Sequence, residues 1–127
     1  MKKLIILIAF APLISFAQIN IGYSKQEILE SLSSYSEGKD SDGINFIKTE
    51  INGDFYYYLD KNGICYACQQ IVTDSDKATE IALSYDKRYK IVDANTWEYK
   101  YDGATIEVMM NFNHQTKSYT FIYYEKE

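Results

Sequence analysis

Three consecutive stretches near the end of the chain alternate between large apolar or aromatic side chains and polar ones. In 96–101 the large residues are Trp97, Tyr99 and Tyr101, and the stretches 106–112 and 119–124 continue the pattern. A two-residue period is typical of β-strands that bury one face and leave the other in water. Asp102-Gly103 is a favoured two-residue hairpin turn between the first two stretches. The region therefore predicts an antiparallel β-meander.

Two other segments have helical spacing instead. Ser24-Lys25-Gln26-Glu27 fits a capping box, and the apolar residues that follow predict a helix over 24–36 that stops at Gly38. The acids of 74–76 and the apolar stripe of 78–89 predict a second helix. Between them, the patterns predict strands over 44–51, 55–59 and 64–73, with a hairpin turn at 60–63.

The resulting order is helix, about three strands, helix, about three or four strands. The two halves are offset by about fifty residues, which indicates an internal repeat of elements. Each helix has an apolar stripe that a sheet must cover. The sequence therefore predicts an α+β fold, with an antiparallel sheet of about six or seven strands and both helices packed on one face, as a tandem α-β-β-β-like repeat.

The amino terminus has the layout of a secretory signal peptide. Two lysines precede an apolar run from Leu4 to Phe16, and Ser15 and Ala17 suit a cut between Ala17 and Gln18. The run is too short to span a bilayer, which takes roughly 20 residues. A buried N-terminal helix or strand is the alternative. We expect residues 1–17 to be removed and residues 18–127 to form one exported domain, periplasmic or extracellular.

The charge of the chain narrows the choice of partners. It carries a formal charge of −5, which becomes −7 without Lys2 and Lys3. An acidic chain with no basic stripe is not suited to nucleic acid. No later apolar stretch is long enough to span a membrane, and no Cys stands at the expected cut to carry a lipid. The expected partner is another exported or envelope protein.

The order of elements resembles that of two families of α/β repeats, and Gly22-Tyr23-Ser24-Lys25-Gln26-Glu27 also resembles the helix start of the second of them. One is the β-lactamase inhibitory protein family, whose disulfide-closed loops have no counterpart here. The other is the small lipoprotein domain of the outer-membrane assembly machine, whose lipid-bearing Cys is also missing. The stretches 60–66 and 96–99 further resemble small uncharacterised secreted bacterial proteins, which have no established activity to transfer.

Cys65-Tyr66-Ala67-Cys68 is a candidate redox motif inside a predicted strand. In a regular strand the two Cα atoms would lie roughly 10 Å apart and the side chains would point to opposite faces. A disulfide would need a bulge or turn at Tyr66-Ala67, so we expect buried free thiols. Two Cys and one His, His114, are too few for a structural zinc site. We expect no metal and no cofactor, and the Asp40/Asp42 and Asp74/Asp76 pairs are expected in a loop and a helix cap.

The alternation also divides the strands into two faces. One set of alternating residues includes Phe55 and Tyr57. If that set packs on the helices, the opposite face carries Tyr56, Tyr58, Met109, Ile122 and Tyr124. These five could form one binding patch, and isolated residues among Thr and Lys are the alternative. The sequence favours a non-enzymatic exported binding module, inhibitor-like or envelope-associated. The alternatives are a thiol- or His-dependent enzyme or redox accessory that uses Cys65, Cys68 or His114, and a structural protein that self-associates through an edge strand.

Overall fold

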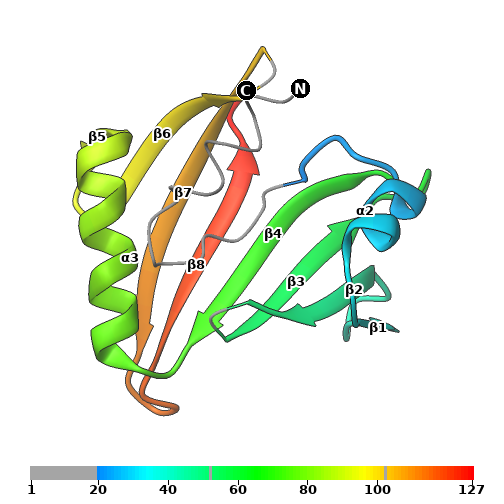
Figure 1. The fold of residues 1–127 in the computed structure, drawn as a ribbon, viewed down its shortest axis with the longest axis horizontal. Helices are drawn as coiled ribbons and strands as arrows, with labels where there is room; N and C mark the ends of the chain where they lie inside the picture. Colours follow the sequence, from blue (N-terminus) through cyan, green and yellow to red (C-terminus); the bar gives the residue numbers. More distant parts are fainter. Residues whose placement is uncertain (1–19, 52, 102) are drawn as a thin grey trace.

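The computed structural model describes residues 20–51, 53–101 and 103–127, and shows an α+β fold with one antiparallel sheet of eight strands and two helices (Figure 1). The expected signal peptide and its cut at Gln18 lie outside these residues, as does Asp102. The strands are β1 (Ser36–Lys39), β2 (Asn45–Glu50), β3 (Asp54–Leu59), β4 (Cys65–Val72), β5 (Lys90–Asp93), β6 (Thr96–Tyr101), β7 (Ala104–Asn113) and β8 (Ser118–Glu125). The helices are α2 (Lys25–Ser31) and α3 (Ser75–Arg88).

The sheet is built from two halves that meet in its middle. Its strand order is β1-β2-β3-β4-β8-β7-β6-β5, so each half is a helix followed by four consecutive strands, and the two last strands pair with each other (Figure 1). The helices begin fifty residues apart, at Lys25 and Ser75, as the offset between the halves predicted. Each half has one strand more than the α-β-β-β pattern.

The two additional strands, β1 and β5, form the edges of the sheet. Each has four residues, and all four residues of β5 are exposed. A short strand without a buried face has no alternation to reveal it. The predicted number of strands, about six or seven, was therefore too small, and the sheet has eight.

Helix α2 has the predicted start but not the predicted length. The Ser24 hydroxyl accepts from the Glu27 amide at 3.2 Å and the Glu27 carboxylate accepts from the Ser24 amide at 2.8 Å, which confirms the capping box. The helix ends at Ser31, and Leu32 is extended, so the expectation of a helix to residue 36 was wrong. Gly38 is not a helix stop. It lies in β1 opposite Phe46, whose ring would have to shift to admit a Cβ at this position.

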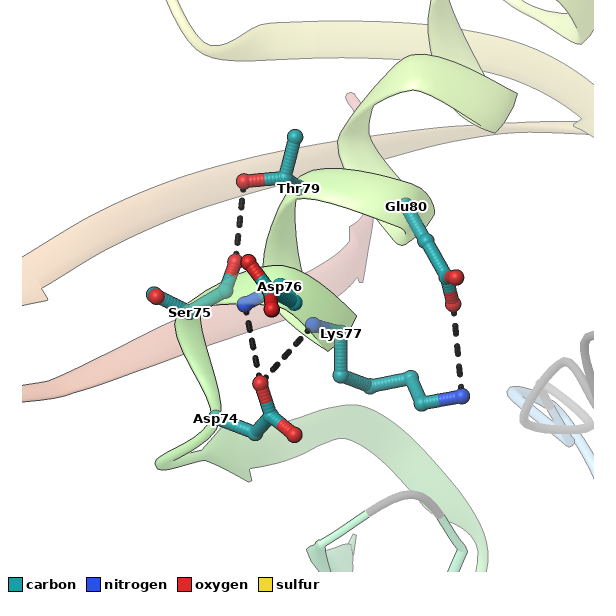
Figure 2. A network of polar contacts seen from close by, with 6 residues as sticks. All are labelled: Asp74, Ser75, Asp76, Lys77, Thr79 and Glu80. Carbon is teal, nitrogen blue, oxygen red and sulfur yellow. Dashed lines mark hydrogen bonds and ion pairs between the residues drawn. The ribbon is translucent and has the colours of Figure 1, made fainter.

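Helix α3 confirms the second predicted helix, and its start is drawn in Figure 2. The Asp74 carboxylate accepts from the amides of Asp76 at 2.9 Å and Lys77 at 3.2 Å. Its apolar stripe buries Ala78, Ile81 and Tyr85. The acids at 74 and 76 thus serve a helix terminus, as expected.

The core lies on one face of the sheet. It contains the buried side chains of both helices together with the inward residues of the strands, among them Phe55, Tyr57, Phe121 and Tyr123. Helix α3 meets the sheet through aromatic contacts, with the Tyr85 ring centroid 5.5 Å from that of Trp97. Both helices therefore cover the same face of the sheet, and neither covers the opposite face.

A polar chain runs through this core. The Tyr85 and Tyr123 hydroxyls lie 2.7 Å apart, and Tyr123 donates to the Gln70 side-chain oxygen at 3.1 Å. The Gln70 amide in turn donates to the Ile51 carbonyl at 2.8 Å. Burial raises the pKa of Tyr123 well above its usual value. The chain satisfies polar groups that the interior would otherwise leave without partners.

Among the residues that the structure describes, no helix is long and apolar enough to cross a membrane.

Candidate functional site

The candidate binding residues lie in two adjacent rows across the middle of the sheet. The register aligns one row as Tyr56, Gln69, Ile122 and Met109, which crosses β3, β4, β8 and β7. It aligns the next row as Tyr58, Ala67, Tyr124 and Glu107 across the same strands. Tyr56, Tyr58, Met109, Ile122 and Tyr124 are thus brought together on one face.

This face is the one that the helices leave open. The chain neighbours of these residues, such as Tyr57 and Tyr123, are fully buried in the core. Because side chains alternate along a strand, the candidate residues point the other way. Each of the five is partly exposed and none belongs to the core cluster.

The structure adds two aromatic residues to this face. The Phe46 ring, on β2, meets Tyr56 and Tyr58 edge-on with centroids 5.3 and 6.2 Å away. Tyr66 is 44 % exposed and lies near Tyr58, whose pKa is raised chiefly by burial and slightly by Tyr66. We define the tyrosine face as the partly exposed set Phe46, Tyr56, Tyr58, Tyr66, Met109, Ile122 and Tyr124.

Sequence reasoning missed both additions for physical reasons. Phe46 lies in the strand predicted over 44–51. Its place on this face follows from its pairing with Tyr58, which the sequence does not reveal. Tyr66 sits at an irregularity of β4, where Tyr58 pairs with Ala67 but Leu59 pairs with Cys65. The residue types at positions 65–68 do not predict this bulge.

Contacts within the tyrosine face hold its rings in place. Tyr56 and Tyr58 stack with centroids 6.1 Å apart and planes 12° apart. The Lys48 ammonium lies 5.7 Å from the centre of the Tyr56 ring, within the range of a cation–π contact. The Tyr58 hydroxyl donates to the Gln69 side-chain oxygen at 2.6 Å. These contacts restrict the rotamers of the side chains on this face.

Burial raises the pKa of two tyrosines on this face, Tyr58 and Tyr124. Desolvation, with smaller effects from Tyr56 and Asp40, raises the pKa of Tyr58 to about 12. Desolvation and a hydrogen bond with the Glu107 carboxylate raise the pKa of Tyr124. Each hydroxyl remains a proton donor at neutral pH. The face can therefore offer aromatic area and hydrogen bonds together.

A charged pair stands at the β6 end of the tyrosine face. Glu98 pairs with Glu107 in the sheet register, and the Lys126 ammonium lies 2.5 Å from the Glu98 carboxylate. The hydrogen bond with Lys126 lowers the pKa of Glu98. The aromatic centre thus has a polar rim on this side, as protein-binding surfaces commonly do.

The placement of Cys65 and Cys68 corrects the regular-strand prediction. They do not point to opposite faces, because the bulge at Tyr66 turns both into the core, where their sulfurs lie 3.8 Å apart. Both side chains are buried, as expected. Burial raises the pKa of the Cys68 thiol, and its hydrogen bond with Cys65 adds to this. Neither sulfur is exposed to a substrate in this conformation.

The other candidate residues lie apart from the tyrosine face. His114 is exposed in the β7–β8 turn, and its ring centroid is 4.7 Å from that of Phe112. Asp40 accepts from the amides of Asp42 and Ile44 at 2.9 Å each, which closes a turn. Within the described ranges, no group of three or more His, Cys, Asp or Glu side chains is arranged to hold a metal ion.

No protein-family model matches the chain, and neither a curated protein nor a solved structure is significantly similar to it.

Proposed function

We propose that this chain is an exported, non-enzymatic binding module, and that the tyrosine face is its contact surface for another exported or envelope protein. The observation that carries the proposal is the alignment of the five predicted residues in two adjacent cross-strand rows on the face opposite the helices. A contiguous aromatic patch on a sheet face is uncommon unless it has a partner.

The chemistry of the patch favours a protein as the partner. Tyrosines give large, rigid contact area with a polar tip, and they are enriched at the centres of protein interfaces. Lys48 on one side and the Glu98–Lys126 pair on the other offer both signs of charge at the rim. Such a rim selects an orientation more than it adds affinity.

Export is supported by the sequence. The positive start, the short apolar run and the small residues before Gln18 make up a signal peptide. The acidic remainder suits a soluble exported domain. We expect the mature protein to begin at Gln18 and to reside in the periplasm or the medium, which N-terminal sequencing of the fractionated protein will test.

A thiol enzyme is the weaker reading of this geometry. A catalytic thiolate needs access to substrate and a lowered pKa. Cys65 is 1 % exposed and Cys68 is fully buried, and the pKa of Cys68 is raised. The pair is better suited to an internal role.

Site-specific photo-crosslinking in the native host tests the proposal. A photoreactive residue replaces Ile122, at the centre of the tyrosine face, and in a matched control it replaces Leu83, which is 54 % exposed on α3. We expect a discrete protein adduct from position 122 and none from position 83. The purified partner should then bind the purified chain directly.

A second comparison separates binding from folding. The double substitution Tyr56→Ser and Tyr58→Ser should abolish the adduct and weaken direct binding by at least about tenfold. Aromatic anchor residues at protein interfaces commonly contribute about 2 kcal/mol or more to binding. Circular dichroism should show an intact fold. Equal adducts from positions 122 and 83, or full binding by the double variant, would refute the assignment.

Edge strand β5 supports a second candidate function, self-association. All four of its residues are exposed, and Ile91 and Val92 are 58 % and 38 % exposed. An exposed apolar edge is a template for pairing with a second copy. Sedimentation over a range of concentrations, with Ile91→Lys as the matched variant, tests it. A monomer at all concentrations would exclude it.

A further inference from the structure

The two cysteines, Cys65 and Cys68, lie in contact with each other inside the core. Their sulfurs lie 3.8 Å apart in the core, although Tyr66 and Ala67 separate them along β4. A regular strand would hold their Cα atoms roughly 10 Å apart. The bulge that pairs Leu59 with Cys65 and Tyr58 with Ala67 turns both side chains to the same side of the strand, where the sulfurs meet. Bond formation at about 2.0 Å requires a small further approach of the two sulfurs.

The surroundings leave each sulfur the other as its reaction partner. The Cys65 thiol donates to the Ala67 carbonyl at 3.4 Å, and Cys68 meets Cys65 and the Asn20 backbone. The phenols of Tyr57, Tyr99 and Tyr123 lie near Cys68 as well. No metal-binding group of three or more ligands occurs in the ranges 20–51, 53–101 and 103–127. A dithiol that is sealed from solvent and in mutual contact is arranged for an internal bond.

The segment that precedes α2 closes over this pair. The Gly22 amide donates to the Cys65 carbonyl at 2.8 Å, and the Cys65 amide donates to the Tyr23 carbonyl at 2.9 Å. Asn20 and Ile21 are buried beside them. Reagents in solution reach the sulfurs only when this segment is detached or before it docks.

We propose that Cys65 and Cys68 are an oxidation site at which an intramolecular disulfide forms across the β4 bulge. The oxidant is a disulfide, either of a small thiol such as glutathione or of an exchange protein. One cysteine thiolate attacks it and forms a mixed disulfide, releasing one thiol. The second thiolate then attacks the cysteine sulfur of the mixed disulfide and releases the other. Two protons and two electrons leave the pair, and the oxidant ends as two thiols.

The bond has a consequence for the surface. It ties together the two residues that flank Tyr66 and Ala67, so it fixes the bulge in place. Tyr66 is the bulge residue on the tyrosine face. Oxidation in the core therefore secures the position of an exposed tyrosine. The disulfide itself does not depend on the proposed binding function.

Refolding in a defined redox buffer tests the proposal. The purified full chain is unfolded, refolded with equal concentrations of reduced and oxidised glutathione, quenched in acid, and alkylated in denaturant. We expect a mass lower by two hydrogen atoms, no alkyl groups, and a digest fragment that joins Cys65 to Cys68. Two alkyl groups, a glutathione adduct on the wild type, or a disulfide-linked dimer would overturn the proposal.

Single-cysteine variants and a second measurement distinguish disulfide formation from an effect of misfolding. Cys65→Ala and Cys68→Ala each leave one thiol, which should carry an alkyl or glutathione group. Wild type should melt about 5–10 °C higher oxidised than reduced, whereas the double Ala variant should show no shift. In the folded oxidised protein, reduction should be at least about tenfold slower than in denaturant. Equal rates would contradict a buried bond.

Discussion

Removal of one buried hydroxyl, in Tyr123→Phe, tests the polar chain that joins α3 to the sheet. The hydroxyl donates to the Gln70 side-chain oxygen at 3.1 Å and contacts the Tyr85 hydroxyl at 2.7 Å. Gln70 is 1 % exposed, so its side-chain oxygen has little access to bulk water as a substitute donor. A buried acceptor that loses its donor costs about 1–3 kcal/mol. We expect the free energy of unfolding to fall by about 2 kcal/mol.

The assay has a built-in reporter and a matched control. Trp97, the single tryptophan, is 3 % exposed, so its fluorescence follows urea unfolding. The control is Tyr124→Phe, which makes the same chemical change one residue further along the chain, on the partly exposed face. It should alter the free energy of unfolding by no more than about 0.5 kcal/mol. The melting temperature of Tyr123→Phe should fall by about 10 °C.

A double-mutant cycle identifies the cause of the loss. In a Gln70→Met background the acceptor is gone, so Tyr123→Phe should cost about 1 kcal/mol less than in wild type. The reasoning is refuted if Tyr123→Phe and Tyr124→Phe have equal effects. It is also refuted if the cost of Tyr123→Phe is the same in both backgrounds.

Three further predictions concern local features. Asp74→Ala removes the acceptor for two amides at the α3 start and should lower the free energy of unfolding by about 1 kcal/mol, measured in urea; an unchanged value contradicts the cap. Gly53→Ala should destabilise the protein severely in the same assay, because φ is 119° and its Cβ would meet the Ile71 carbonyl oxygen at 2.2 Å; wild-type stability would show that the turn differs. Burial raises the pKa of Tyr58 from 10.0 to about 12, so the folded state holds its proton more tightly than the unfolded state does. Its contribution to stability is therefore complete below pH 10.0 and is lost as the pH rises to about 12. A urea-unfolding series across this range, with Tyr58→Phe as control, should show a steeper loss in wild type, and equal slopes would contradict it.

Local sequence patterns predicted the elements that have a buried face. The alternation around Tyr57 and Tyr123 identified β3 and β8, and the stripe from Ala78 to Tyr85 identified α3, because burial imposes a period on the sequence. The helix expected to continue to residue 36 ended at Ser31 instead. Pairing of β1 with β2 over Ser36–Lys39 overrode the weak helical spacing there.

The candidate site was predicted in part. The five face residues follow from parity along each strand, but their alignment in two rows depends on the pairing of β4 with β8, which lie about fifty residues apart. Nothing local specifies that pairing. Phe46 and Tyr66 join the face only through the pairing with β2 and through the bulge.

The sequence by itself determined which side chains are buried, because two-residue and helical periods are local consequences of hydrophobic burial. Only the tertiary structure decided which strands are neighbours, and hence that scattered tyrosines share one surface. It also decided that Cys65 and Cys68 meet, because a single extra residue in β4 reverses the parity on which the regular-strand prediction depended.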